Sequence, residues 1–288
     1  MTVQLSSWYG SARPPVNCRS AVERSRREQA SVRSHLFLLR ELVRRDFQGR
    51  YAGSLLGFVW SLVQPLWLLL LFTFVFSTVM KVSPVGDMRT RHFAVFLFGG
   101  LLPWMALQEG VLRSSTAITD NSSLVKKLRF PSEILVLAVV LAALLHEAIA
   151  ACLFLGVLAW TGELSWSGLP LLLIAVPLQV GLALGLGLVV AAVQVFFRDT
   201  AQLLGMVLNA WFYLTPVVYP LALVPERFRG WIELNPLTPL VGLYRQAFFG
   251  GHASLVPGTG VLFVVVAVVL SAGFWVFRHL KRAFADEI

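Results

Sequence analysis

Three side chains that can exchange protons lie inside long apolar stretches of this sequence. Glu109 is one of them, and His146 and Glu147 are adjacent near the middle of a later apolar run. Ionisable groups in hydrocarbon are costly and usually face a polar partner or a water-filled path, so a proton relay is one interpretation. The other is packing and hydrogen bonding at a helix interface. The lack of a second series of acids within the apolar runs favours the latter.

Aromatic side chains form a second group with a chemical use. Trp60, Trp67 and Phe74 recur every seven residues with Gln64 between them, which places them near one face of a helix. Such a face can stack on the apolar side of a sugar ring, while the polar atoms at the ends of its side chains bind the hydroxyl groups of the sugar. Ordinary helix packing and membrane-interface belts are the alternative. The candidate substrate path consists of Trp60, Gln64, Trp67, Phe74, Trp104, Phe212, Tyr213 and Tyr219.

A basic segment, residues 121–131 (NSSLVKKLRFP), separates two apolar runs. Each Lys or Arg would cost about 2.5–3.5 kcal/mol at the centre of a bilayer, so this segment lies outside the hydrocarbon. Leu124 and Leu128 are one helical turn apart, which predicts a short cytoplasmic helix offered to a soluble partner. Alternatively, the segment only fixes the topology by its positive charge. The candidate contact residues are Ser122, Leu124, Lys126, Lys127, Leu128, Arg129 and Phe130.

The sequence lacks motifs for nucleotide or metal chemistry. It contains no G-x-x-x-x-G-K-[ST] motif, so we expect no P-loop nucleotide site in this chain. No D-x-D pair and no His or Cys cluster with metal-ligand spacing occurs. The two cysteines, Cys18 and Cys152, imply no disulfide framework. We therefore expect no catalytic residue, metal or cofactor in this chain.

Composition identifies an all-α polytopic membrane protein. Of 288 residues, 57% are hydrophobic and 14% charged, with a mean hydropathy of +0.74, whereas soluble domains are about 25% charged. The net charge of +9 lies in short loops beside apolar runs, which favours contact with lipid headgroups over nucleic acid. Residues 1–33 contain no apolar core of a signal peptide, so the first span is expected to act as its own insertion signal.

The pattern predicts six transmembrane helices behind an amphipathic helix. Residues 1–34 are expected to be a disordered, basic, cytoplasmic tail. Residues 35–50 are expected to lie in the plane of the interface, with Arg40, Arg44 and Arg45 opposite an apolar side that includes Phe47. Pro65 should kink the first span or break its first turn. The spans are expected at about 56–80, 93–112, 132–160, 169–197, 201–219 and 257–277.

The lengths of the spans and the distribution of charged residues add detail to this predicted topology. The third span is long enough to tilt or to project beyond the membrane, and Gly181 and Gly185 in the fourth predict close helix contact. Residues 220–256 hold four prolines and a 13-residue apolar piece, too short to cross, which predicts a re-entrant outer segment. Of the 24 Lys and Arg residues, 18 fall on the side of the termini, which places both termini in the cytoplasm. Residues 35–288 then form one transmembrane domain.

Four stretches resemble the membrane subunit of ABC-2 type polysaccharide exporters, which move O-antigen, capsule, teichoic acid or related cell-wall glycans. Together they cover nearly half of the chain and include most of the polar, charged and proline positions that stand out from its apolar runs. They are residues 46–67 (DFQGRYAGSLLGFVWSLVQPLW), 99–135 (GGLLPWMALQEGVLRSSTAITDNSSLVKKLRFPSEIL), 196–220 (FFRDTAQLLGMVLNAWFYLTPVVYP) and 224–251 (VPERFRGWIELNPLTPLVGLYRQAFFGG).

The resemblance implies a homodimer of this chain in the bacterial cytoplasmic membrane, with two copies of a separate P-loop ATPase beneath it. ATP and Mg would be bound by that partner, and residues 121–131 would be the coupling helix that fits a cleft on it. The implied substrate is a lipid-linked polysaccharide moved out of the cytoplasm. Two rival functions stay open: a proton-coupled lipid-linked sugar flippase that uses Glu109, His146 and Glu147, and a drug or small-lipid exporter on the same scaffold.

Overall fold

The computed structural model describes residues 36–49, 59–80, 93–127, 131–250 and 255–287. Within these ranges the chain forms helices joined by turns, and no strand occurs there. The predicted all-α class is therefore confirmed for the described part of the chain. The tail over residues 1–34 lies outside it.

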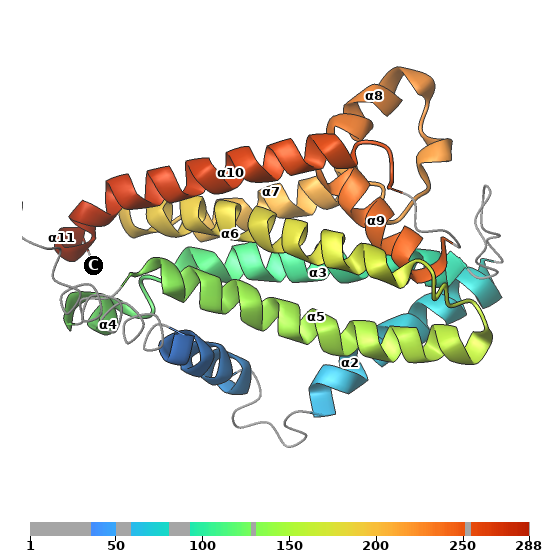
Figure 1. Ribbon diagram of the computed structural model, residues 1–288, viewed down its shortest axis with the longest axis horizontal. Helices are drawn as coiled ribbons and strands as arrows, with labels where there is room; N and C mark the ends of the chain where they lie inside the picture. The colour runs from blue at the N-terminus through green and yellow to red at the C-terminus, as the bar shows by residue number, and fades with distance from the viewer. Residues whose placement is uncertain (1–35, 50–58, 81–92, 128–130, 251–254, 288) are drawn as a thin grey trace, which may run out of the picture.

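Four long apolar helices form the body of the molecule and run alongside one another (Figure 1). In the described ranges these four are long and apolar enough to cross a membrane, so the protein is a multi-pass membrane protein. Their positions agree with the second, third, fourth and sixth predicted spans to within a few residues. They are α3 (Phe93–Thr116), α5 (Glu133–Thr161), α6 (Leu172–Phe196, preceded by the 3₁₀ turn η3, Leu169–Leu171) and α10 (Thr259–Leu280).

The first and fifth predicted spans are shorter helices. α2 (Trp60–Phe72) continues as a π-helix, η2 (Thr73–Val79), and it passes through Pro65 without ending there. α7 (Thr200–Leu214) ends five residues before the predicted end of the fifth span. Thr215 precedes a proline and has extended angles (φ −104°, ψ 136°), because a residue before proline is disfavoured in a helix.

Two buried clusters hold the helices together. The larger unites α3, α5, α6, α7, α9 (Leu237–Phe249) and α10. The smaller joins the N-terminal helix, residues 36–49, to Ala117 and Ile118 in the turn after α3 and to α5, α6, α10 and the C-terminal Phe284. A Cβ atom added at Gly185 would lie 2.8 Å from the backbone of Leu270, so α6 and α10 touch at close range. This confirms the predicted close contact at the glycines of the fourth span.

The two ends of the bundle differ (Figure 1). At one end lie the N-terminal helix, the short α4 (Ser122–Lys127) and α11 (Phe284–Glu287), which follows the turn η5 (Lys281–Ala283). At the other end η4 (Leu221–Leu223) leads into α8 (Glu226–Leu234), which projects away from the long helices. α9 then turns back and packs on α3 and α6, burying most of its side chains.

Candidate functional site

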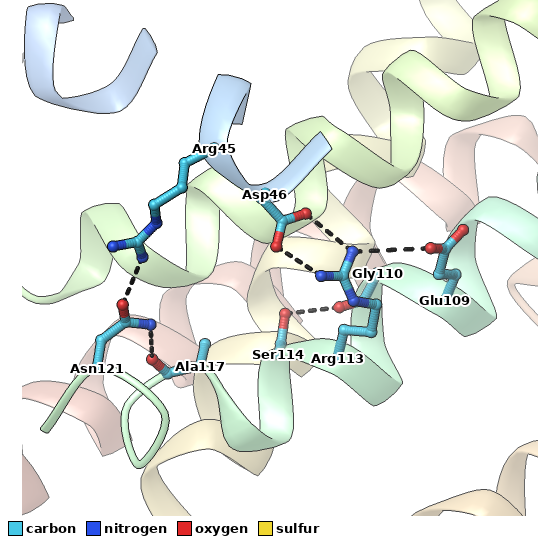
Figure 2. A network of polar contacts seen from close by, with 8 residues as sticks. All are labelled: Arg45, Asp46, Glu109, Gly110, Arg113, Ser114, Ala117 and Asn121. Atoms are coloured by element: carbon cyan, nitrogen blue, oxygen red, sulfur yellow. Dashed lines mark hydrogen bonds and ion pairs between the residues drawn. The ribbon is translucent and has the colours of Figure 1, made fainter. Parts of the chain in front are cut away.

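A bidentate ion pair attaches the N-terminal helix to the end of α3 (Figure 2). Arg113 donates from Nη1 to Oδ2 of Asp46 at 2.8 Å and from Nη2 to Oδ1 at 2.5 Å. Arg113 Nη1 also lies 3.8 Å from Glu109 Oε1. The planar guanidinium fits a carboxylate with two parallel bonds, which fixes orientation as well as distance. α3 runs through Arg113 to Thr116, four residues beyond the predicted end of the span at residue 112, so the pair lies in the last turn of the helix.

A second contact joins the N-terminal helix to the segment expected to bind a partner. Arg45 donates to Oδ1 of Asn121 at 2.5 Å, and Asn121 donates from Nδ2 to the carbonyl of Ala117 at 2.9 Å (Figure 2). The carbonyl of Asn121 accepts the backbone N–H groups of Leu124 and Val125, which start α4. The N-terminal helix, the end of α3 and α4 are thus one connected unit. Because it contains the predicted coupling segment, it is called the coupling unit (residues 36–49 and 113–127), and its coupling role stays a prediction.

α4 is the helical part of the predicted coupling segment. Val125 packs against the smaller buried cluster, whereas Ser123 and Lys126 are exposed and Ser122 and Leu124 are half-buried. Leu128, Arg129 and Phe130 lie outside the described residues, as does the side chain of Lys127. On the N-terminal helix, Leu42 is buried. Three further residues lie where the amphipathic pattern predicted them: Arg40 and Arg44 are exposed, and Phe47 is half-buried.

The predicted aromatic stripe of the first span is exposed. Trp60, Trp67 and Phe74 are 44%, 63% and 57% exposed, and Gln64 is exposed with them. The rest of the described chain does not cover these side chains, and other large aromatic side chains, such as Trp160 and Trp275, are exposed as well. This face of α2 and η2 is therefore available to a substrate, a lipid or a second copy of the chain.

The other predicted path residues do not share this exposure. Trp104 is only 3% exposed; its Nε1 donates to Gln108 at 2.9 Å, and its ring packs on Trp211 and Phe212. Trp104 has no surface for a substrate in this conformation, so its predicted place in the path does not fit the structure. Phe212 is half-buried beside it. Tyr213 is exposed, and the half-buried Tyr219 donates its hydroxyl to the carbonyl of Tyr213 at 3.0 Å.

The three ionisable residues of the apolar runs meet at one cavity of about 590 Å³, between α2, α3 and α5. His146 Nδ1 lies 3.4 Å from Glu109 Oε2, which makes a pair that can exchange a proton. Glu147 instead accepts a hydrogen bond from Gln179 Nε2 at 2.7 Å, which joins α5 to α6. The relay interpretation thus fits Glu109 and His146, and the interface interpretation fits Glu147.

Two further polar residues, which sequence reasoning missed, hold α9 in place. Tyr244 donates its hydroxyl to Gln179, which also donates to the carbonyl of Pro103 at 3.3 Å. Arg245 donates to the carbonyls of Phe96, Pro216 and Val217 at 3.2, 2.8 and 2.5 Å, and it stacks over the ring of Phe96. The sequence signal for Arg245 is its position as the single charged residue within the apolar piece 237–249, which favours a buried, hydrogen-bonded role.

Comparisons with known proteins extend over nearly the whole chain. The family model described as ABC-2 type transporter matches residues 38–249. Over 253 residues the chain is 30% identical to the O-antigen export system permease protein RfbA of Myxococcus xanthus, covering 87% of this chain and 95% of that protein. It is 30% identical over 258 residues to the O-antigen export system permease protein RfbA of Klebsiella pneumoniae, and the match covers 86% of this chain and 94% of that protein. It is 26% identical over 242 residues to the polysialic acid transport protein KpsM of Escherichia coli, covering 83% and 92%. From the family match and these relatives we conclude that the chain belongs to the ABC-2 type transporter family.

Proposed function

We propose that this chain is the membrane subunit of an ATP-driven exporter that moves a lipid-linked polysaccharide out of the cytoplasm. The observation that carries the proposal is the similarity to permeases named for O-antigen export, which extends over 94–95% of their length. The sequence has no P-loop motif, which fits a permease whose ATPase is a separate chain that binds ATP and Mg.

A polysaccharide needs a path made of protein. Each hydroxyl group costs several kcal/mol to transfer into hydrocarbon without a partner, so a glycan cannot cross lipid unaided. The exposed face of α2 and η2 supplies aromatic faces and one amide, which suit sugar rings. Two copies of the chain related by a twofold axis would bring such faces together around a channel. The exposed stripe therefore supports a homodimer whose channel is lined by Trp60, Gln64, Trp67 and Phe74.

Six spans result if α2 with η2 and α7 cross the membrane as well. In this arrangement η4, α8 and α9 form a re-entrant segment that closes the channel on the outer side. Irregular backbone at membrane depth must have its polar groups satisfied by protein. Arg245 on α9 supplies such bonds to the carbonyls of Pro216 and Val217, directly after α7. Both termini and the coupling unit then face the cytoplasm of a bacterium, in agreement with the distribution of Lys and Arg.

The coupling unit is the proposed docking surface for the ATPase. α4 exposes Ser123 and Lys126, and its start is tied through Asn121 to Arg45. A push on α4 would therefore reach the N-terminal helix and, through Asp46 and Arg113, the end of α3. Rigid contacts of this kind carry movement from a partner into a bundle.

Co-expression with the P-loop protein encoded beside this chain tests the proposal. We expect a stable complex of two copies of each chain, whose mass can be measured in a lipid nanodisc. A chain that purifies alone, with no P-loop protein bound under any nucleotide condition, would contradict it.

The proton-coupled flippase is a second candidate, favoured by the 3.4 Å contact between His146 and Glu109 at the cavity. It requires transport to stop when the proton gradient is collapsed while ATP is held constant. It also requires Glu109→Gln to abolish transport without loss of ATPase binding. An exporter driven by ATP alone would continue under a protonophore.

A further inference from the structure

One side of α10 is left uncovered along most of the helix. α10 runs along the outside of the bundle, and of the four long apolar helices in the described ranges it is the least buried (Figure 1). Its large apolar side chains Val261, Val264, Val268 and Trp275 are 49–69% exposed. They are spaced three, four and seven residues apart, which places them on one side of a helix. Because α10 is long enough to cross a membrane, this side is suited to contact with lipid.

The same side becomes basic at the C-terminal end of α10. Arg282 follows Trp275 by seven residues, and Arg278 and His279 lie between them. All three are exposed, and 73% of the side chain of Arg278 is accessible. The ring of Trp275 stacks on that of His279, with the ring centres 5.7 Å apart. A tryptophan between apolar and basic residues is typical of the boundary between hydrocarbon and lipid headgroups.

The turn that contains Arg282 is fixed to the rest of the molecule. Phe284, two residues later, is 1% exposed, and its ring packs on that of Phe277 with the centres 5.4 Å apart. Lys281 donates to Oε2 of Glu133, the first residue of α5, at 2.9 Å. These two contacts hold η5 against the bundle, so Arg282 is held in place at the end of α10.

The charges of the two arginines are available to a ligand. Glu133 is already bound by Lys281, and Arg278 Nε lies 4.0 Å from Glu133 Oε1, which is beyond hydrogen-bond distance. The exposed Glu287 follows Arg282 by more than one helical turn. Two guanidinium groups one turn apart attract an anion and repel an ammonium group, and guanidinium groups bind phosphate oxygens through paired hydrogen bonds.

We propose that the C-terminal end of α10 binds the headgroup of an anionic phospholipid. Arg278 and Arg282 bind the phosphate, Trp275 and His279 lie at the boundary below it, and the acyl chains cover the apolar side that includes Val268. A headgroup with a net negative charge is preferred to a zwitterionic one, because the ammonium group of the latter is repelled by the same arginines. The inference goes beyond the proposed function and requires only that α10 crosses the membrane.

The test measures which lipids contact α10. Ser271 is exposed one turn before Trp275, so Ser271→Cys in the full chain with Cys18→Ser and Cys152→Ser carries a fluorescent label on the apolar side. The labelled protein is placed in phosphatidylcholine nanodiscs that contain a lipid with brominated acyl chains, which quenches the label on contact. The brominated lipid is either phosphatidylglycerol, which is anionic, or phosphatidylcholine, which is zwitterionic. The acyl chains of the two are identical, so only the headgroup differs.

We expect brominated phosphatidylglycerol to reach a given quenching at a mole fraction at least about fivefold lower than brominated phosphatidylcholine. That ratio is the effect of about one basic residue near an anionic lipid surface. Arg278→Gln combined with Arg282→Gln should make the two mole fractions equal, whereas lysine at both positions should preserve most of the difference. The matched control is Arg40→Gln with Arg44→Gln, two exposed arginines with the same spacing on the N-terminal helix, on the opposite side of the bundle (Figure 1). It should leave the ratio unchanged.

Three results would overturn the proposal. The first is equal quenching by the two lipids in the chain with both arginines, and the second is an equal loss of preference in the control pair. The third is quenching by neither lipid, which would show that a second copy of the chain covers this side of α10. Because the assay contains no ATPase and no glycan, its failure leaves the export proposal standing. A preference for the anionic lipid in a chain that binds no ATPase would support the lipid site and still contradict ATP-driven export.

Discussion

At the scale of single residues, the aromatic side chains divide into two groups with different expected roles. Trp104 is enclosed by Trp211 and Phe212 in the larger buried cluster. Trp67 is 63% exposed on α2. Substitution of the first should therefore affect stability, and substitution of the second should affect contact with other molecules.

Replacing each tryptophan with alanine separates these roles. Trp104→Ala should lower the stability of the folded chain by about 3–5 kcal/mol, because a large side chain is removed from a packed core. Trp67→Ala should leave the melting temperature in detergent unchanged and reduce glycan export in cells. Equal losses of melting temperature in the two variants would place Trp67 in the packing of the chain and remove it from the channel.

Gly100 lies against Arg245, the residue whose hydrogen bonds to the carbonyls of Phe96, Pro216 and Val217 hold α9 in place. A Cβ atom there would lie 2.6 Å from Arg245 Nη2 and 3.2 Å from the carbonyl of Val217. Gly100→Ala should therefore displace Arg245 and lower the melting temperature. The control is Gly156→Ala in α5, where a Cβ atom meets nothing within 4 Å. That change should leave the stability of the folded chain unchanged or raise it by about 0.4–1 kcal/mol. A lower melting temperature for Gly156→Ala than for Gly100→Ala would refute the role of Arg245 in holding α9.

At the residue scale, the sequence pattern predicts what is local. Spacing by seven residues places Trp60, Trp67 and Phe74 along the first span, where all three are exposed, and their role in a substrate path stays a prediction. Spacing could not show that Trp104 faces inward, because the neighbours that cover it come from α7, about a hundred residues later. The hydrogen bonds of Arg245 could not be predicted either, because their acceptors belong to α3 and to the turn after α7, far from α9 in the sequence.

At the scale of elements, hydropathy predicted most helices and their approximate bounds. One difference has a local cause, since Pro216 ends α7 early. The other is that α3 continues past residue 112 to Thr116, which the apolar pattern could not show because the last turn is polar. The amphipathic pattern predicted the helix over residues 36–49. It could not predict that this helix is tied to α3 and Asn121, because such contacts depend on the tertiary fold.

Removing Asp46 should release the N-terminal helix. The pair with Arg113 is bidentate and partly buried, so Asp46→Ala should weaken the docking of the helix by about 1–3 kcal/mol. Trypsin should then cut faster at Arg40 and Arg44 in nanodiscs, and glycan-dependent ATP turnover should fall. Asp46→Glu should restore part of the protection. Glu41→Ala, at an exposed position on the same helix, is the control. Unchanged proteolysis in Asp46→Ala would refute the connected coupling unit.

The exposed lysine of α4 tests the docking surface. Lys126→Glu should weaken binding of the ATPase by roughly tenfold, if the lysine makes one charged hydrogen bond of about 1.5 kcal/mol to the partner. The melting temperature of the chain alone should not change, because Lys126 is exposed. Arg282→Glu makes the same charge change at another exposed site near the C-terminus. An equal loss in both variants would show a general effect of charge rather than a contact by α4.

At the scale of the whole molecule, the two ends and one side of the bundle are suited to different partners. The coupling unit and the C-terminus lie together at one end, and α8 projects at the other (Figure 1). The aromatic side of α2 is left uncovered by the rest of the chain. In the proposed exporter, a single copy contributes half of the channel and one docking surface, and a second copy and two ATPases complete the assembly.

ATP turnover in proteoliposomes is the most direct test of this account. The chain and its neighbouring P-loop protein are reconstituted together, and hydrolysis is measured with and without lipid-linked glycan and with and without a protonophore. The account predicts that glycan changes the rate of turnover, that Lys126→Glu removes this response, and that the protonophore has no effect. A complex that does not form, combined with glycan movement that stops when the proton gradient is collapsed, would contradict ATP-driven export and support the proton-coupled flippase.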